Sequence, residues 1–246
     1  MNDLENVERL LKYKKILITG GTGQLGYELN SSLKFLGKIW IPSRQEFDLS
    51  DPESLRDKIR KNKPDLIINS AAYTSVEGAE INRELARTIN TFAPKVIAEE
   101  ANRIQIPLIH YSTDYVFDGS KKLPYTENDK PNPKNIYGKT KLDGELAIKS
   151  VHNQFLIIRT SGVYSTDRGN NFYRKMLKLF KEKEKIYVVN DQISSPTSTK
   201  YLAKKTAQII KQLNNFLLKD KRWQIYHLTE NKIMSWYEFA LKIYKD

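Results

Sequence analysis

The sequence of 246 residues contains no cysteine, which excludes disulfide bonds, thiolate metal sites and cysteine nucleophiles outright. No apolar run approaches the roughly 20 residues needed to span a bilayer, and no charged-then-apolar secretion signal opens the chain. We therefore expect a cytoplasmic protein without a membrane partner. The 39% hydrophobic and 28% charged residues are typical of a globular protein that can bury a sizeable core.

Acidic residues are fewer than basic ones, because 29 Asp and Glu stand against 41 Lys and Arg, a formal net charge of +12. Such an excess suits nucleic acid or an anionic small ligand. The run from Lys178 to Lys185 alternates with Glu182 and Glu184 at an expected helix end, and no stacking aromatics interleave with it. A solvated lysine-rich surface is therefore favoured and no nucleic-acid partner is expected, although the positive field would suit a ligand carrying a diphosphate.

Strands and helices are expected to alternate along the chain, which favours an α/β fold with a doubly wound parallel sheet of the Rossmann type. The expected strands are Lys15 to Thr19, Lys38 to Ile41, Leu66 to Asn69, Pro107 to Tyr111, Phe155 to Thr160, Ile186 to Val189 and Ile225 to Leu228. The expected helices are Gln24 to Leu36, one that starts at Pro52 with Asp51 as its cap, Thr88 to Arg103, Ile136 to Ser150, Asn171 to Lys183, Thr199 to Leu213 and Ser235 to Tyr244.

Only 11 glycines occur, yet several gather in Gly20-Gly21-Thr22-Gly23-Gln24-Leu25-Gly26, between the first expected strand and helix. Glycines spaced three apart let the backbone approach a pyrophosphate, whose charge the helix N-terminus stabilises. A tight turn of any α/β protein is the alternative reading of such a pattern. The strand-turn-helix context favours a dinucleotide cofactor.

The end of the second expected strand bears on which dinucleotide would bind. An Asp or Glu there would bind the ribose 2'-hydroxyl of NAD, but this chain reads Ile41-Pro42-Ser43-Arg44. Arg44 could instead bind a 2'-phosphate, which favours NADPH, while NADH is left open. An exposed loop arginine without a ligand is the alternative.

The segment Tyr137-Gly138-Lys139-Thr140-Lys141 places a phenol and an ammonium four residues apart, on one face of an expected helix. The charge of Lys141 near the Tyr137 hydroxyl would lower the pKa of that phenol. We therefore expect Tyr137 to act as an acid and base near neutral pH. Together with the glycine turn, this pair indicates hydride transfer to a carbonyl.

Six further segments follow one another along the chain. They are Asn69-Ser70-Ala71-Ala72-Tyr73-Thr74, Tyr111-Ser112-Thr113-Asp114-Tyr115-Val116-Phe117-Asp118-Gly119, Tyr137 to Glu145, Arg159-Thr160-Ser161 with Tyr164, Gly169-Asn170-Asn171-Phe172, and Asn190-Asp191-Gln192 with Pro196-Thr197. In this order they resemble the dTDP-4-dehydrorhamnose reductase family, a group of extended short-chain dehydrogenase/reductases that act on nucleotide sugars. The resemblance runs from about Lys14 to the end of the chain.

The resemblance implies NADPH-dependent reduction of the C4 keto group of dTDP-4-dehydro-6-deoxy-L-mannose, a step in nucleotide-sugar and cell-surface polysaccharide biosynthesis. It implies that Tyr137 donates the proton, that Thr113 hydrogen-bonds the same oxygen, and that Lys141 holds the nicotinamide ribose and keeps Tyr137 acidic. The cofactor residues it implies are Gly20, Gly23, Gln24, Leu25, Gly26, Arg44, Asp48, Leu49, Ala72, Tyr73, Thr74, Tyr111, Tyr137 and Lys141. The substrate residues are Thr113, Asp114, Val76, Gly162 and Asn171, and no metal is expected.

The resemblance also implies a division of the chain into parts. An N-terminal extension over 1–13 would precede a NAD(P)-binding Rossmann core over 14–160, to which segments near 186–212 and 223–230 return. Most of 161–246 would form a small C-terminal substrate-binding lobe, interleaved with the core. A homodimer is left open.

Related families are less compatible with the residues present. Sugar-nucleotide dehydratases carry an Asp-Glu pair after the threonine, whereas Thr113 is followed by Asp114-Tyr115, and epimerase-reductases of the GDP-fucose synthase type need a cysteine. The family usually has a tryptophan where this chain has Gly162, which removes an aromatic wall expected against the substrate. The alternatives are a reductase of another nucleotide 4-ketosugar, carrying dTDP or UDP, and an NADP-binding regulatory subunit similar to the methionine adenosyltransferase β subunit.

Several neighbouring residues have simpler structural interpretations. We expect Tyr115 and Phe117 to be core or wall residues, Ser112 to satisfy a backbone group, and His110 to pack at a strand end. Tyr164 fits either role. Solvated helix faces account for three carboxylates that lack metal-ligand spacing, namely Glu77, Glu80 and Glu145.

Overall fold

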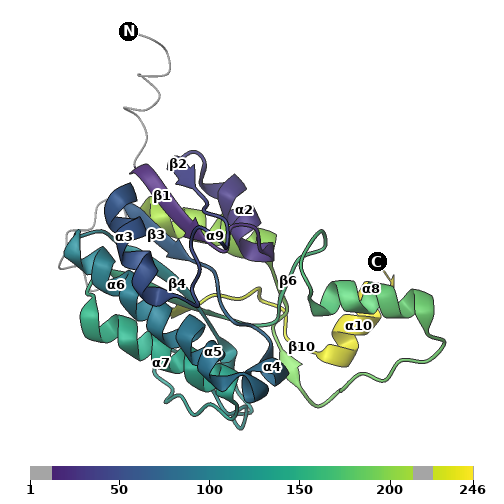
Figure 1. The fold of residues 1–246 in the computed structure, drawn as a ribbon. Helices are drawn as coiled ribbons and strands as arrows, with labels where there is room; N and C mark the ends of the chain where they lie inside the picture. The colour runs from purple at the N-terminus through teal and green to yellow at the C-terminus, as the bar shows by residue number, and fades with distance from the viewer. Residues whose placement is uncertain (1–12, 213–223, 246) are drawn as a thin grey trace.

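The computed structural model describes residues 13–212 and 224–245. The expected N-terminal extension therefore lies outside the described residues except for Tyr13, and so do Leu213, at the end of an expected helix, and residue 223 of an expected returning segment. Figure 1 shows a sheet flanked by helices, with a smaller group of helices set to one side.

A six-stranded parallel sheet forms the centre of the core, with the strand order β2-β1-β3-β4-β5-β9. The order reverses direction between β1 and β3, and this reversal confirms the predicted doubly wound Rossmann fold. The strands are β1 (Tyr13–Thr19), β2 (Gly37–Trp40), β3 (Leu66–Asn69), β4 (Leu108–Thr113), β5 (Phe155–Thr160) and β9 (Ile225–His227).

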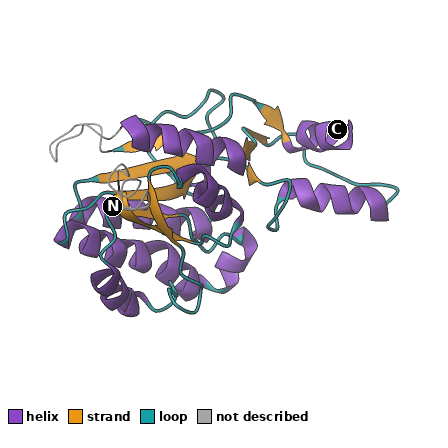
Figure 2. Ribbon diagram, turned by 90° about the horizontal axis from the view of Figure 1, so that it is seen from above, coloured by secondary structure: helices purple, strands orange, loops and turns teal. Residues whose placement is uncertain are grey.

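Helices cover both faces of the sheet, which lies between them when viewed from above (Figure 2). One apolar cluster joins the sheet to α2 and α9, and a second joins its other face to α3, α6 and α7. β3, β4 and β5 are buried along their whole length, which explains why they read as continuous apolar runs. The helices are α2 (Gln24–Leu33), α3 (Pro52–Asn62), α4 (Val76–Ile81), α5 (Arg83–Arg87), the π-helical turn η1 (Thr88–Phe92), α6 (Ala93–Arg103), the 3-10 turn η2 (Asp114–Val116), α7 (Ile136–Val151) and α9 (Thr199–Gln212).

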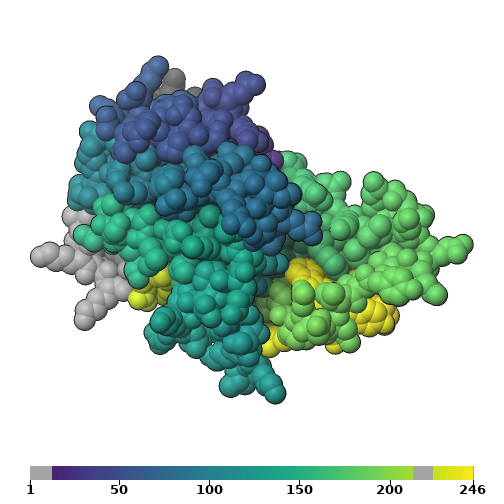
Figure 3. Space-filling view, turned by 60° about the horizontal axis from the view of Figure 1, so that its bottom comes forward, coloured from purple at the N-terminus to yellow at the C-terminus, as the bar shows by residue number. Residues whose placement is uncertain are grey.

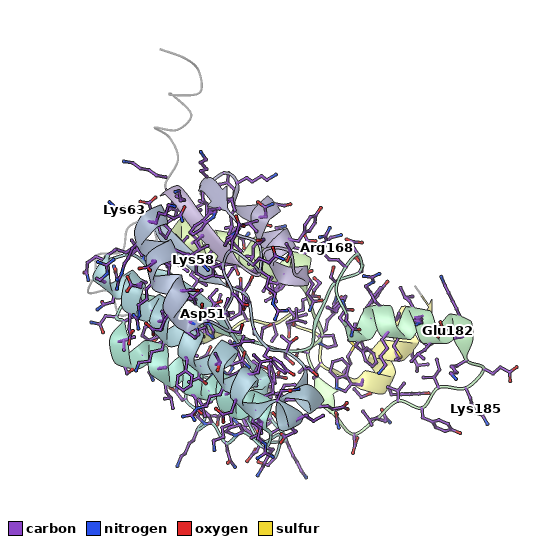
Figure 4. The ribbon with its side chains drawn as sticks, in the orientation of Figure 1. Asp51, Lys58, Lys63, Arg168, Glu182 and Lys185 are labelled. Atoms are coloured by element: carbon purple, nitrogen blue, oxygen red, sulfur yellow. The ribbon has the colours of Figure 1, made fainter. Side chains whose placement is uncertain are left out.

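A small lobe projects from the side of the core, drawn in green and yellow in Figure 3. Its aromatic cluster is formed by α8 and α10 with Tyr164, Ile186 and Val188. Glu182 and Lys185 lie at the end of the lobe farthest from the sheet (Figure 4). The elements outside the main sheet are β6 (Val163–Tyr164), α8 (Phe172–Glu182), β7 (Ile193–Ser194), β8 (Thr197–Ser198), β10 (Met234–Ser235) and α10 (Trp236–Lys245).

The structure confirms six of the seven predicted strands and corrects the seventh. The segment from Ile186 to Val189 is not a strand, because Ile186 and Val188 pack on the lobe cluster while the Val189 carbonyl accepts a hydrogen bond from Tyr237 N at 3.0 Å. The alternating apolar residues of this segment therefore pack against helices instead of forming a strand. The division of the chain into domains stays a prediction.

Three predicted helices differ in detail. α2 ends at Leu33, and Leu36 is buried just beyond it. Asp51 is the N-cap residue of α3, but its side chain makes no capping hydrogen bond. The helix predicted from Thr88 to Arg103 begins with the π-helical turn, a feature frequent at functional sites. Over 13–212 and 224–245 no helix combines the length and apolarity that crossing a bilayer would need.

Candidate active site

The glycine turn lies between the carboxyl ends of β1 and β3, where the strand order reverses and ligands of such sheets bind. Gly20 has φ +65°, and a Cβ there would lie 3.0 Å from Ala71 on the segment after β3. A Cβ on Gly26 would lie 2.3 Å from the Gly20 carbonyl oxygen. Both positions therefore require glycine for close backbone approach.

The N-terminus of α2 has the properties of an anion-binding site. Gly23 is its N-cap residue and provides no side chain to occupy the first N–H groups. Leu25 is buried in the core, so any contact of this residue with a phosphate would come from its backbone. The turn thus fits a dinucleotide pyrophosphate, whose charge the helix end would stabilise.

The residues predicted to lie near the adenosine end surround the turn that follows β2. Arg44 is exposed, as a side chain that reaches for a 2'-phosphate must be. Asp48 accepts a hydrogen bond from Ser50 N at 2.9 Å, which holds the pKa of its carboxyl below the ordinary value. Leu49 is buried in the core. Their contacts with a cofactor stay predictions.

The segment Ala72-Tyr73-Thr74 leaves β3 at the same edge and leads to Val76, the first residue of α4. Asn90, in the π-helical turn, holds this segment, because its Oδ1 accepts from Tyr73 N at 2.9 Å and its Nδ2 donates to Tyr73 O at 3.1 Å. The same Nδ2 lies 3.1 Å from Thr140 Oγ1 on α7. Asn90 therefore fixes the wall after β3 against the helix that carries Tyr137.

A cluster of two hydroxyls and a carboxyl lies at the carboxyl end of β4, formed by Tyr137, Thr113 and Asp114. Asn135 caps α7, with its side chain accepting from Gly138 N at 2.8 Å, and so sets Tyr137 in the first turn. The Tyr137 ring lies 5.5 Å from the Tyr115 ring between centroids, two residues after Thr113, and Thr113 Oγ1 donates to Asp114 Oδ1 at 3.1 Å. The structure thus brings together the predicted proton donor and the second predicted hydroxyl.

Lys141 is 2% exposed, and its ammonium points toward β4. Lys141 Nζ lies 2.6 Å from the Tyr111 carbonyl oxygen and 3.2 Å from His110 Nε2. Burial lowers the pKa of Lys141 to about 8. Tyr111 therefore meets the site through its carbonyl, whereas its phenol binds Thr206 on α9 at 2.6 Å.

The expected effect of Lys141 on the phenol is corrected by this geometry. Burial raises the pKa of Tyr137, and the nearby Asp114 raises it further, while the hydrogen bond with Thr113 lowers it. Lys141 is not among the groups that shift this pKa, and its Nζ is turned to the Tyr111 carbonyl. A neutral phenol has its proton available for donation, so the free site is already in the acid form.

Asp114 connects the core to the segment that leads into the lobe. Its Oδ2 accepts from Ser161 Oγ at 2.7 Å, and Ser161 Oγ lies 2.7 Å from Ser194 Oγ on β7. Burial raises the pKa of Asp114. Gly162 turns the chain from β5 into β6 with φ +54°, and a Cβ there would lie 3.1 Å from Pro196 Cα. Glycine at this position therefore permits a left-handed turn that a tryptophan would strain.

Asn171 lies beside the glycine turn. Its Nδ2 donates to Gln24 Oε1 at 3.0 Å, while its Oδ1 caps α8 by accepting from Arg174 N at 3.1 Å. Arg168 stacks on Tyr27 of α2, with the guanidinium carbon 3.3 Å from the ring centroid, and Figure 4 labels Arg168 on the segment that precedes α8. Asn171 is thus placed against the predicted cofactor turn, and its role with substrate stays a prediction.

Two expectations about polar residues near the site were wrong. Glu145 does not lie on a solvated helix face: it is 1% exposed and forms an ion pair with buried Arg159, at 2.9 Å and 2.6 Å. Ser112 does not satisfy a backbone group, since its hydroxyl donates to Glu145. Phe117 is buried as expected, beneath the Arg159 guanidinium, whereas Tyr115 is 40% exposed and meets the Tyr137 ring edge to face.

The structure also identifies polar residues that the sequence reasoning missed or set aside. Three polar residues are paired in register across adjacent strands: Thr19 at the end of β1, Asn69 at the end of β3 and His110 within β4, with Thr19 opposite Asn69 and Asn69 opposite His110. We call these three residues the polar row. Each of the three follows by two residues an apolar residue that packs toward α3, α6 and α7, so its side chain points to the same face of the sheet. The polar row therefore faces Lys141. One polar residue at matching positions of three apolar strands was the signal available in the sequence.

A family model described as RmlD substrate binding domain matches residues 14–246. The dTDP-4-dehydrorhamnose reductase of Escherichia coli (strain K12) is 40% identical over 235 residues, which cover 94% of this chain and 77% of that protein.

Two solved structures share the fold. One is a dTDP-4-dehydrorhamnose reductase from Clostridium acetobutylicum, with a TM-score of 0.87 and 38% identity, covering 94% of this chain and 79% of that one. The other is the Bacillus anthracis dTDP-4-dehydrorhamnose reductase in complex with NADP, with a TM-score of 0.84 and 36% identity over 94% of this chain and 80% of that one. These matches confirm the resemblance seen in the six segments: the chain belongs to the family of the RmlD substrate binding domain.

Proposed function

We propose that this protein is a dTDP-4-dehydrorhamnose reductase, which reduces the C4 keto group of dTDP-4-dehydro-6-deoxy-L-mannose to dTDP-L-rhamnose with NADPH. The observation that carries the proposal is that the Tyr137 ring lies against Tyr115, just after Thr113 at the carboxyl end of β4, on the same sheet edge as the glycine turn. The relatives named above and the NADP complex of one of them support the substrate and the cofactor. NADH is a weaker alternative.

NADPH, when bound, supplies the hydride. The glycine turn and the N-terminus of α2 would hold its pyrophosphate, and Arg44 would bind the 2'-phosphate that distinguishes it from NADH. The wall after β3, from Ala72 to Thr74, would line the dinucleotide. In this scheme Asn90 keeps that wall at a fixed distance from α7 through its hydrogen bonds to Tyr73 and Thr140.

Tyr137 would donate its proton to the oxygen that becomes the C4 hydroxyl. The raised pKa of the phenol in the free site keeps that proton in place until the oxygen begins to carry negative charge. Thr113 Oγ1 would stabilise the same charge as a second donor by turning its single proton from Asp114 Oδ1 to that oxygen. Lys141 would hold the nicotinamide ribose beside them.

Asp114 would bind a hexose hydroxyl as an acceptor, while its Oδ2 accepts from Ser161 Oγ at 2.7 Å. Val76, Gly162 and Asn171 would complete the substrate site from α4, the β5–β6 turn and the start of α8. A cytoplasmic location and a homodimer belong to the same proposal, and they stay predictions.

The test mixes the purified protein with NADPH and enzymatically generated dTDP-4-dehydro-6-deoxy-L-mannose and follows absorbance at 340 nm. The expected result is NADPH oxidation that Tyr137→Phe reduces at least about a hundredfold. Tyr187→Phe is the matched control, because Tyr187 loses the same hydroxyl at an 89% exposed position of the lobe.

Two other outcomes would redirect the proposal. Oxidation only with a UDP-linked or a differently configured 4-ketosugar would assign another substrate to the same site. Binding of NADPH without turnover of any ketosugar would favour the regulatory alternative.

A further inference from the structure

The polar row and Lys141 form a continuous buried array beneath the site. Thr19 Oγ1 donates to Asn69 Oδ1 at 2.6 Å, Asn69 Nδ2 lies 3.0 Å from His110 Nδ1, and His110 Nε2 lies 3.2 Å from Lys141 Nζ. Their exposed fractions run from 0% to 2%. At such burial each donor is expected to meet an acceptor.

The direction of the hydrogen bonds starts at Thr19. Its hydroxyl oxygen accepts from Ala71 N at 3.3 Å, which leaves the hydroxyl proton for Asn69 Oδ1. The 2.6 Å separation is normal for an O–H···O bond and short for an N–H···O bond. The amide oxygen of Asn69 therefore faces Thr19, and its N–H donors face His110.

That orientation decides the tautomer of His110. Because Asn69 donates to Nδ1, this nitrogen must be the acceptor, and a neutral imidazole then carries its proton on Nε2. Burial and the neighbouring Lys141 hold the pKa of His110 well below its ordinary value, so the ring is neutral. Its Nε2–H points at Lys141 Nζ, an arrangement that suits a neutral amine and opposes an ammonium.

The geometry points to His110 as a positioning residue that sets both where the Lys141 amine lies and whether it carries a proton, with Asn69 and Thr19 acting by fixing which ring nitrogen of His110 donates. This inference rests on the proposed function only for the step from Lys141 to catalysis. The tautomer itself is a property of the free protein.

Other charged groups also lie around Lys141. Glu145, one turn further along α7, raises the pKa of Lys141, but its carboxylate is engaged by Arg159 of β5 and by Ser112 of β4. Tyr137 lies one turn earlier on α7, and β1 and β3 contribute only the uncharged Thr19 and Asn69. Burial is the larger effect and lowers the pKa of Lys141 to about 8.

The first experiment is ¹⁵N NMR of the histidine rings in the free protein. Protonated and unprotonated ring nitrogens have well-separated shifts, and His110→Gln identifies the His110 signals among those of the three histidines. The expected result is a neutral His110 with its proton on Nε2. Asn69→Asp should reverse this, because a carboxylate accepts from Nδ1–H and leaves Nε2 free to accept from the Lys141 ammonium. A proton on Nδ1 in the unmodified protein would overturn the inference.

The second experiment measures the alkaline limb of kcat/KM against pH for NADPH-dependent reduction. Asn69→Asp and His110→Gln both offer Lys141 a second acceptor besides the Tyr111 carbonyl, so each should move this limb upward by about one pH unit or more. His152→Gln is the control, since it removes another buried histidine outside the array. A role confined to packing would lower activity or stability without moving the limb, and an unmoved limb in both variants would refute the tuning.

The two experiments separate failure of the inference from failure of the proposed function. If the ketosugar is not reduced, the pH limb cannot be recorded, but the NMR result still supports or overturns the hydrogen-bond direction. If the ketosugar is reduced and His110 carries its proton on Nδ1, the proposed function stands and the inference fails.

Discussion

Replacing Glu145 by glutamine should destabilise the protein more than most single substitutions. Glu145 and Arg159 are 1% and 4% exposed, and two hydrogen bonds of 2.9 Å and 2.6 Å join them. Glutamine keeps the volume but leaves the guanidinium buried without a countercharge. Removing one partner of such a pair costs about 3–5 kcal/mol.

This cost is large compared with the total stability of a folded domain, which is about 5–15 kcal/mol. For a chain of this size each kcal/mol lowers Tm by roughly 2–4 °C, so we expect a loss of roughly 6–20 °C. Equilibrium unfolding in urea would give the free energy, and differential scanning calorimetry would give Tm. Glu182→Gln is the matched control, because Glu182 and Lys178 form an exposed pair at 3.8 Å that contributes at most about 1 kcal/mol.

A loss below about 1 kcal/mol for Glu145→Gln would refute the reasoning, because it would mean that the guanidinium finds water or another acceptor at no cost. The hydrogen bond from Ser112 to Glu145 gives a further check. Ser112→Ala should cost much less than Glu145→Gln, since the ion pair remains intact.

Three further outcomes are expected. Gly26→Ala places a Cβ 2.3 Å from the Gly20 carbonyl oxygen, so NADPH affinity, measured by fluorescence titration, should fall at least about tenfold. The far-UV circular dichroism spectrum should be retained. Unchanged affinity would mean that the glycine turn is not part of the cofactor site. Thr113→Val should lower kcat by about a hundredfold with little change in KM, and an equal loss from KM alone would make Thr113 a binding group only. Burial lowers the pKa of His152 from 6.5 to about 4, so between these pH values the unfolded chain binds a proton that the folded protein does not. The free energy of unfolding should therefore fall by up to about 3 kcal/mol as pH drops from 6.5 to 4. A His152→Gln variant whose free energy of unfolding falls equally with pH would contradict this.

Local patterns were sufficient to predict the parts of the fold and site that depend on neighbours in sequence. The glycine turn, the i and i+4 placement of Tyr137 and Lys141, and the continuous apolar runs of β3 and β5 all follow from backbone geometry over a few residues. The structure places these elements where the patterns predict.

Polar contacts between distant segments could not be predicted in the same way. Glu145 reads as a surface residue of a helix until Arg159, on the neighbouring strand, is seen to lie against it. His110 reads as a lone histidine because its partners, Asn69 and Lys141, lie 41 and 31 residues away. The strand predicted from Ile186 to Val189 failed for a related reason, since only the packing of α8 and α10 decides what that segment covers.

The return of α9 and β9 to the core sets an order for folding on the ribosome. Leu29 and Leu33 of α2 are buried partly by Leu202 and Ile210 of α9, which are synthesised roughly 170 to 180 residues later. At a synthesis rate of about 5–20 residues per second, the apolar face of α2 is made roughly 10–35 s before the α9 residues that bury it.

The lobe is completed later still, because α8 precedes α9 in the sequence whereas its packing partner α10 follows β9. The sheet can therefore close before the lobe has a core. The contacts that join the two run from Asp114 through Ser161 to Ser194 and from Asn171 to Gln24. A newly made chain thus holds a finished nucleotide-binding sheet before it holds a finished enzyme.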